Sequence, residues 1–187
     1  MLDLKEEFNA FRDECVDLAI LINTFDRLFG DAQAKSALGR IAPQFSNDLN
    51  RWMIELYILK SYRLLDREVG FGRKNLSAKY LGSRLEDAKL LTSEIQRLLS
   101  KLDEYRQLIH AARNRLVAHA DLEQIVLKVG LGEHSEKQAL DFRKNLQDFC
   151  DAVGRAIGVG PTEFINISPG DVSDLLHHLK YSTRHSG

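Results

Sequence analysis

Arg113 and His119 have the types and the spacing that acid–base chemistry on a phosphate ester requires. On an ideal helix they lie about 9 Å apart along the axis and about 60° to either side of Leu116. A guanidinium is always charged and offers phosphate oxygens a fork of N–H donors. An imidazole titrates near neutrality and can exchange a proton with a hydroxyl. Together they can promote attack of an RNA 2′-hydroxyl on its adjacent phosphate without a metal ion, one group as base and the other stabilising the pentavalent transition state.

The same residues also have an ordinary structural interpretation, which the sequence leaves open. An arginine and a histidine within two turns of a helix are common, and a structural histidine with satisfied hydrogen bonds is the more frequent case. Asn114 supports the pair in one interpretation; in the other it points nearly opposite Leu116 and caps the helix or meets solvent. His110 and His134 have no evident partners in the sequence.

Further polar residues could support the site or bind RNA: Arg63, Asp66, Arg73, Lys74, Asn75, Arg115 and Asp121. A carboxylate at Asp66 or Asp121 could orient the imidazole, and the basic and amide side chains could bind phosphate. Each has a structural alternative. Arg63 and Asp66 are three residues apart and can pair on one helix face, and Asp121 can cap the next segment. The loop at 73–75 and the side chain of Arg115 can be solvated surface.

Nothing in the sequence indicates a metal site or a cofactor. There is no Glu-x-x-His pair for a di-iron bundle, no P-loop and no dinucleotide fingerprint. His177 and His178 are adjacent and would point about 100° apart on a helix, which makes them poor ligands for one ion. Cys15 and Cys150 form neither a disulfide framework nor a zinc ribbon, and we expect small buried thiols in a reducing compartment.

The elements that must position these residues have helical periodicity along almost the whole chain. We expect helices over 3–30, 32–38, from 45 to about 66, 78–85, 87–118, 136–157 and 169–181. Residues 121–131 fit either a helix or a short buried strand, and residues 70–77 are the most loop-like. The prediction is an all-α bundle of four or five principal helices with a short C-terminal helix.

Two of the expected helices carry apolar seams with alternating steps of four and three. The first comprises Phe45, Leu49, Trp52, Leu56 and Leu59, and continues to the charged Arg63 and Asp66. The second comprises Leu91, Ile95, Leu98, Leu102, Tyr105, Ile109, Ala112 and Leu116, and its next step is His119. Such a seam must be covered, either within the chain or by a second copy. The second seam therefore motivates a homodimer and leaves intramolecular packing as the alternative.

Composition places the chain among ordinary globular proteins, with 187 residues, 44% hydrophobic and 28% charged. The net charge of −1 hides an asymmetry, because residues 1–50 carry a balance of −4 and residues 70–119 a balance of +5. This basic middle fits a surface for phosphate or nucleic acid, or simply a solvated helix face. No stretch approaches the ~20 apolar residues of a membrane span, and the acidic start does not resemble a signal peptide. We expect a cytoplasmic protein with no membrane contact.

Three short segments carry a resemblance to a known family. The pattern of Arg113, the polar Asn114 and His119, with five residues between arginine and histidine, resembles the signature of HEPN domains. More narrowly, the segments 62–66 (YRLLD), 72–77 (GRKNLS) and 113–121 (RNRLVAHAD) resemble, in this order, the AbiU-type abortive-infection branch. The resemblance covers roughly residues 1–160. HEPN domains are small helical bundles, usually dimeric, and many are metal-independent endoribonucleases of toxin–antitoxin and phage-defence systems.

The resemblance implies that Arg113 and His119 are catalytic, that Asn114 supports them, and that two subunits share the active cleft. We expect a HEPN-like bundle over 1–160 and a C-terminal extension over 161–187, with a short helix packed on the same domain. The expected function is a metal-independent endoribonuclease that cuts RNA, has no cofactor and pairs with a possible antitoxin protein. Two alternatives stay open: a catalytically silent dimer that binds RNA or nucleotide, and a non-enzymatic partner in a toxin–antitoxin or defence complex.

Overall fold

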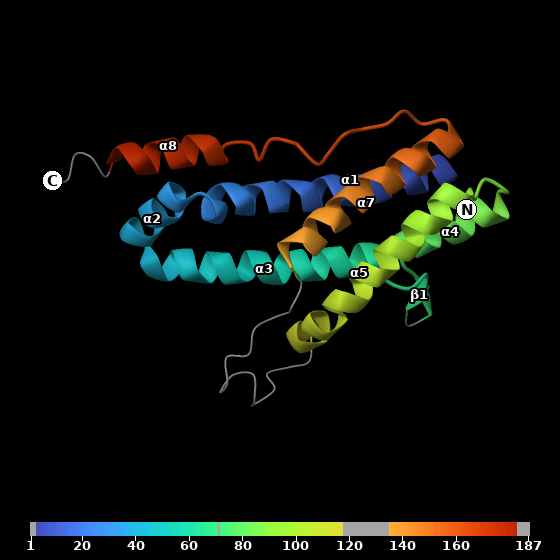
Figure 1. Cartoon of the computed structure of the whole chain (residues 1–187), viewed down its shortest axis with the longest axis horizontal. Helices are drawn as coiled ribbons and strands as arrows, with labels where there is room; N and C mark the ends of the chain where they lie inside the picture. The colour runs from blue at the N-terminus through green and yellow to red at the C-terminus, as the bar shows by residue number, and fades with distance from the viewer. Residues whose placement is uncertain (1–2, 71, 118–134, 183–187) are drawn as a thin grey trace.

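The computed structural model describes residues 3–70, 72–117 and 135–182, and it is an all-α helical bundle, as predicted (Figure 1). The helices are α1 (Leu4–Phe25), the π-helix η1 (Asp26–Gly30), α2 (Ala32–Ile41), α3 (Pro43–Leu65), α4 (Ala78–Asp87), α5 (Ser93–Val117), α7 (Glu136–Ile157) and α8 (Val172–Ser182). Helices α1 and α3 lie side by side and antiparallel, while α5 and α7 pack on each other and cross the first pair obliquely (Figure 1).

The helix ends follow the capping chemistry that the sequence predicts. Helix α1 begins after the N-cap Asp3, whose backbone N–H donates to a carboxylate oxygen of Glu6 at 3.3 Å. Helix α7 begins after Ser135, whose hydroxyl accepts from the backbone N–H of Gln138 at 3.3 Å. It ends at Gly158, whose φ of 71° is a left-handed conformation that favours glycine. The predicted bounds of α7 are therefore confirmed at both ends.

The helix expected over residues 87–118 is wrong at its start. Helix α4 ends at Asp87, and α5 begins only at Ser93, after a break that contains Lys89 with φ of 59°. The hydroxyl of Thr92 accepts from the backbone N–H of Ile95 at 3.2 Å, which caps α5. The apolar Leu90 and Leu91 continue the helical periodicity through this break, so local capping chemistry and not the apolar pattern sets the boundary.

The loop-like stretch after α3 contains a small antiparallel hairpin of β1 (Val69–Gly70) and β2 (Arg73–Lys74). Gly72 has a φ of 75°, which permits the tight turn between the two strands. The side-chain amide of Asn75 donates to the backbone carbonyl of Arg67 at 2.9 Å and so closes the base of the hairpin.

The seam of α5 forms the centre of the bundle core. Its residues Ile95, Leu98, Leu102, Tyr105, Ile109 and Ala112 are each no more than 4% exposed in a single chain. They pack with aromatic residues of α1 and α7, where Phe11 and Phe149 meet edge to face with ring centroids 5.9 Å apart. From Ile95 to Ala112 the α5 seam is therefore covered within the chain, and this part of it does not call for a second copy.

Three of the five apolar residues of the seam predicted on α3 face solvent, while Leu49 packs against a small core cluster and Leu59 is half-buried. Phe45, Trp52 and Leu56 are 53%, 49% and 43% exposed, and together they form what we name the α3 stripe. The helix instead buries residues from its other faces, among them Ile58 and Leu65. The four–three spacing correctly predicted a helix, but α3 is apolar on more than one face and the spacing did not identify the buried one.

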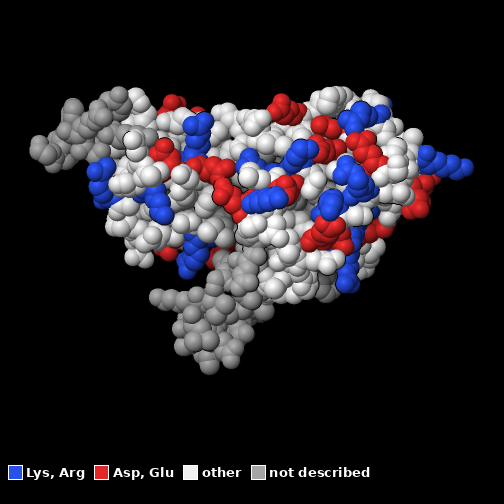
Figure 2. All heavy atoms as spheres, viewed as in Figure 1, with Lys and Arg blue, Asp and Glu red and all other residues white. Residues whose placement is uncertain are grey.

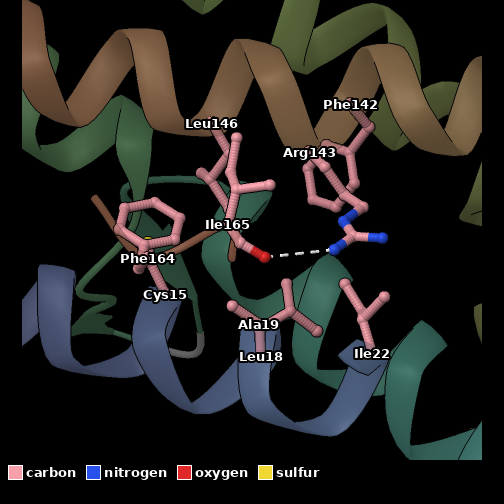
Figure 3. A pocket seen from close by; sticks show the side chains of 9 residues that line it. All are labelled: Cys15, Leu18, Ala19, Ile22, Phe142, Arg143, Leu146, Phe164 and Ile165. Atoms are coloured by element: carbon pink, nitrogen blue, oxygen red, sulfur yellow. Dashed lines mark hydrogen bonds between the residues drawn. The ribbon is translucent and has the colours of Figure 1, made fainter. Parts of the chain in front are cut away.

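The segment after α7 runs back along α1 to α8, which packs beside α2 (Figure 1). It is held by the side-chain amide of Asn23, which donates to the carbonyls of Ile165 and Ile167 at 2.9 and 2.8 Å. Arg143 of α7 donates to the same Ile165 carbonyl at 3.3 Å (Figure 3). The apolar space beneath these groups has a volume of only about 10 Å³, so side chains fill it. Helix α8 begins at Val172, after the left-handed Gly170, and not at Pro169 as expected.

Candidate functional site

Helix α5 presents the predicted pair Arg113 and Asn114 at the edge of the bundle. Ile109 and Ala112 of the same helix are 1% and 2% exposed and fix this face of α5 against the core. Asn114 is exposed and Arg113 is partly buried. The Nη1 of Arg113 donates to the side-chain oxygen of Asn114 at 3.1 Å. The structure therefore brings the predicted arginine and its polar neighbour into direct contact.

The guanidinium of Arg113 lies over the ring of Tyr62, which belongs to the end of α3. Its Cζ is 5.0 Å from the ring centroid, a distance typical of a cation–π contact. Tyr62 is only 7% exposed, so the arginine covers a ring that belongs to the core surface. Helices α3 and α5 cross at this point, and their crossing decides where the guanidinium lies.

His110, one turn before Asn114 on α5, joins the same group. The amide nitrogen of Asn114 lies 3.3 Å from His110 Nδ1 and 3.4 Å from Nε2. An amide nitrogen only donates, so the ring nitrogen that pairs with it is the unprotonated one. The imidazole also lies against Tyr62, with ring centroids 5.9 Å apart. The expectation that His110 has no partner is therefore wrong.

A second arginine of α5 contacts the same tyrosine, through both its hydroxyl and its ring. Arg106 donates to the Tyr62 hydroxyl at 3.1 Å and places its Cζ 5.8 Å from the ring centroid. Its Nε donates to Asp103 at 3.0 Å, and Lys79 of α4 lies 2.7 Å from the same carboxylate oxygen. Partial burial works to raise the pKa of Asp103, but hydrogen bonds from Lys79, Arg106 and Gln107 outweigh it and lower the pKa to about 2.

Ion pairs engage part of the predicted basic middle of the chain. Four of its cations pair with carboxylates, namely Lys79 and Arg106 with Asp103, Arg84 with Glu7, and Lys101 with Glu104. On the face shown in Figure 2, Lys and Arg are interspersed with Asp and Glu and do not gather into one patch. Arg113 forms no ion pair with any carboxylate that the structure describes. Among the described ion pairs, Arg113 therefore differs from these four structural cations and shares an unpaired charge with Arg73, Lys74, Lys89 and Arg97 of the same segment.

The hairpin residues form contacts of their own. Asn75 closes the hairpin as described above, and the Nζ of Lys74 lies 5.6 Å from the ring centroid of Tyr80. Arg73 is exposed on β2. The hydrogen bonds and ring contacts in the described part of the chain do not connect these residues to Arg113.

The end of α3 places Arg63 and Asp66 beside Tyr62 in sequence but not in the same contact network. Arg63 is exposed, and a carboxylate oxygen of Asp66 accepts from the backbone N–H of Arg67 at 2.8 Å. The two side chains do not pair with each other among the ion pairs of the described residues. Asp66 therefore serves the turn that follows α3.

Three predicted residues cannot be placed. His119 and Asp121 lie outside the described residues, and so does the side chain of Arg115, although its backbone belongs to α5. Their roles stay predictions. Within residues 3–70, 72–117 and 135–182, no group of three His, Cys, Asp or Glu side chains could hold a metal ion. None of the helices described is long and apolar enough to cross a membrane.

Sequence reasoning missed Tyr62, Arg106 and His110 as members of the site. Residues 106, 110 and 113 follow steps of four and three, which places them on one face of a helix. This spacing was available in the sequence. The role of Tyr62 was not, because it depends on how α3 crosses α5.

The helical bundle agrees with the comparison with known families. Residues 1–175 match the model of AbiU2, a family of abortive-infection HEPN domains, and the chain belongs to this family. The match runs from α1 into α8, beyond the residues on which the resemblance depended. No curated protein and no solved structure matches the chain.

Proposed function

We propose that this HEPN domain is a metal-independent endoribonuclease that cuts RNA through Arg113 and His119 and works as a homodimer. The observation that carries the proposal is the state of Arg113. Its guanidinium has a fixed position over Tyr62, and no described carboxylate neutralises it. Such a cation is suited to bind a phosphate and to stabilise charge that develops on it.

The reaction that we propose is an attack of the RNA 2′-oxygen on the neighbouring phosphorus. His119 takes the proton of the 2′-hydroxyl, the new P–O bond forms, and the bond to the 5′-oxygen of the next nucleotide breaks. Arg113 stabilises the additional negative charge on the phosphate oxygens in the transition state. The departing 5′-oxygen takes up a proton and becomes a hydroxyl. The upstream fragment therefore ends in a cyclic phosphate or, after hydrolysis, in a 3′-phosphate.

The homodimer is supported by the α3 stripe, since the α5 seam is covered within the chain from Ile95 to Ala112. Phe45, Trp52 and Leu56 form an exposed apolar line of the kind that marks interaction sites. The line continues by helical steps to Leu59 and Arg63, which flank Tyr62 on α3. Leu56 lies only about 9 Å along the helix axis from Tyr62, so a second copy seated on this stripe would lie close to the end of α3 that carries the Arg113 site.

The dimer has its own test. We expect sedimentation at micromolar concentration to give a dimer for the wild type and a monomer for Trp52→Glu, because the charge would be desolvated at the interface. Lys5→Glu changes an exposed charge on α1 and serves as the matched control. A wild-type monomer, or a Trp52→Glu dimer of unchanged affinity, contradicts this arrangement.

The activity is tested with end-labelled single-stranded RNA in excess EDTA. We expect cleavage to persist in the chelator and the upstream fragments to carry cyclic or 3′-phosphate ends. Loss of cleavage that magnesium or manganese restores, or 3′-hydroxyl ends upstream, would overturn the mechanism.

Two variants connect the activity to the proposed residues. His119→Ala and Arg113→Ala should each lose nearly all cleavage, since a general base contributes ~10²–10⁴-fold and a donor to a developing anion ~10²–10³-fold. Arg97→Ala and His178→Ala, at exposed positions of α5 and α8, are the matched controls and should cut normally. Binding of RNA without cleavage, measured across salt, would favour the silent dimer. Neither binding nor cleavage would favour a non-enzymatic partner of a toxin–antitoxin or defence complex.

A further inference from the structure

In the described part of the chain, an aromatic ring and not a carboxylate holds Arg113. An arginine at a protein surface is commonly fixed by an ion pair, and Arg106, Arg84 and Arg143 are held in this way here. A carboxylate partner neutralises the charge and occupies the N–H donors that a phosphate would use. The ring of Tyr62 attracts the guanidinium through its face, and it neither neutralises the charge nor occupies the N–H donors.

We propose that Tyr62 is the positioning residue of Arg113: it holds the guanidinium in place for a phosphate of the RNA without pairing its charge with a carboxylate of the described residues. The proposal rests on the proposed function, because it assigns Tyr62 a role in that reaction. Tyr62 acts through Arg113 and does not itself touch the RNA, since its ring is only 7% exposed.

The tyrosine is well fixed for this role. Its hydroxyl accepts from Arg106 at 3.1 Å, Arg106 pairs with Asp103 at 3.0 Å, and Lys79 anchors the same carboxylate at 2.7 Å. This chain of contacts joins α3, α5 and α4, so the position of the ring is determined by three helices. A guanidinium on such a ring loses little freedom when a phosphate binds.

The donors that remain on Arg113 also fit the role. A guanidinium has five N–H donors, and among the described residues only Nη1 is engaged, by the side-chain oxygen of Asn114 at 3.1 Å. The other donors can form a bidentate contact with a phosphate. The aromatic contact thus fixes the orientation of the guanidinium without occupying its N–H donors.

The test compares Tyr62→Phe with Tyr62→Leu in three measurements. Thermal unfolding establishes that each variant folds, steady-state cleavage gives kcat and KM, and NMR follows the side-chain Nε–Hε signal of Arg113, assigned with Arg113→Lys.

The ring face should shift the Arg113 signal upfield relative to that of the exposed Arg97. Tyr62→Phe keeps the ring and should keep this shift, with cleavage within about twofold of wild type. Tyr62→Leu should lose the shift and lower kcat on the order of tenfold.

A double-mutant cycle separates positioning from general stability. If Tyr62 acts through Arg113, Tyr62→Leu should cause no further loss in the Arg113→Ala background. A folded Tyr62→Leu variant with wild-type kcat, or one whose loss is the same in both backgrounds, would overturn the proposal. If Tyr62→Leu does not fold, the wild-type spectrum still decides, because an Arg113 signal without the ring shift contradicts the contact.

The experiment also distinguishes a failure of the proposed endoribonuclease activity from a failure of the positioning role of Tyr62. A wild-type protein that cuts no RNA but shows a ring-shifted Arg113 signal would overturn the endoribonuclease and leave Tyr62 as the residue that holds the arginine. In that case, titration with a single-stranded RNA oligonucleotide should still be weaker for Tyr62→Leu than for Tyr62→Phe. Equal binding by both variants would overturn the positioning role as well.

Discussion

Two arginines of helix α5, Arg106 and Arg113, contact the same tyrosine ring and differ in almost everything else. Arg106 donates to the Tyr62 hydroxyl and to Asp103, and its side chain is 13% exposed. Arg113 lies over the ring face, donates to an amide, and pairs with no carboxylate in the described part of the chain. The two residues have the same chemistry and nearly the same helical face, so their partners alone set them apart.

The two arginines show how one helix can carry a structural cation and, about two turns later, a cation that we propose to be reactive. A largely buried guanidinium with a carboxylate partner is satisfied, and through Tyr62 and Asp103 its contacts link α3, α4 and α5. A guanidinium on an aromatic ring is held but not neutralised. Residue type cannot distinguish these cases, whereas the partner can.

The largest expected effect comes from removing each arginine in turn. Arg113→Ala should lower cleavage by ~10²–10³-fold, because a donor to the developing charge is lost, and should leave the melting temperature nearly unchanged. Arg106→Ala should act mainly on stability: it removes the donor to the Tyr62 hydroxyl and leaves Asp103 with only Lys79 and Gln107, and it should cost about 1–3 kcal/mol in the free energy of unfolding. Urea unfolding and RNA cleavage per folded molecule measure both effects. Equal losses of activity in the two variants would remove the distinction between the arginines.

A smaller effect concerns the carboxylate that makes Arg106 structural. The folded-state pKa of Asp103, about 2, lies below the ordinary value, so its stabilisation is fully present above about pH 4 and is lost as the pH falls toward 2. The shift corresponds to on the order of 2 kcal/mol. Urea unfolding should show this acid-induced loss in the wild type and a weaker one in Asp103→Asn.

The matched control is Asp148→Asn, which breaks an ion pair with Lys144 on the surface of α7. Because pairs of this kind contribute little, its acid profile should follow that of the wild type. An Asp103→Asn variant with an unchanged acid profile would show that Asp103 does not carry this stabilisation.

The helices could be predicted from the sequence where local chemistry and apolar periodicity agree. Helix α7 shows such agreement, with a capping box at Ser135 and a left-handed Gly158. Between α4 and α5 they disagree, and the cap at Thr92 overrides an apolar pattern that runs on. On α3, periodicity found the helix but not its buried face, because that face depends on which neighbours pack against it.

The same distinction holds for the candidate site. Arg113 and Asn114 could be chosen from their types and spacing along one helix. The network around them could not, because Tyr62 comes from another helix and reaches Arg113 only through the crossing of α3 and α5. Whether an arginine is paired or free to bind a phosphate depends on residues that are distant in the chain. Such contacts cannot be predicted from the local sequence pattern.

The smallest expected effect concerns the amide beside Arg113. Asn114 orients the guanidinium through one hydrogen bond and is itself held by His110, so Asn114→Ala should lower cleavage only about two- to tenfold, the equivalent of one hydrogen bond. His110→Ala acts one contact further away and should have a smaller effect. Gln96→Ala, at an exposed position on the same helix, is the control for a lost amide and should cut like wild type. If Asn114→Ala instead removes as much activity as Arg113→Ala, the amide contacts the RNA directly and belongs with Arg113 as a substrate-binding group.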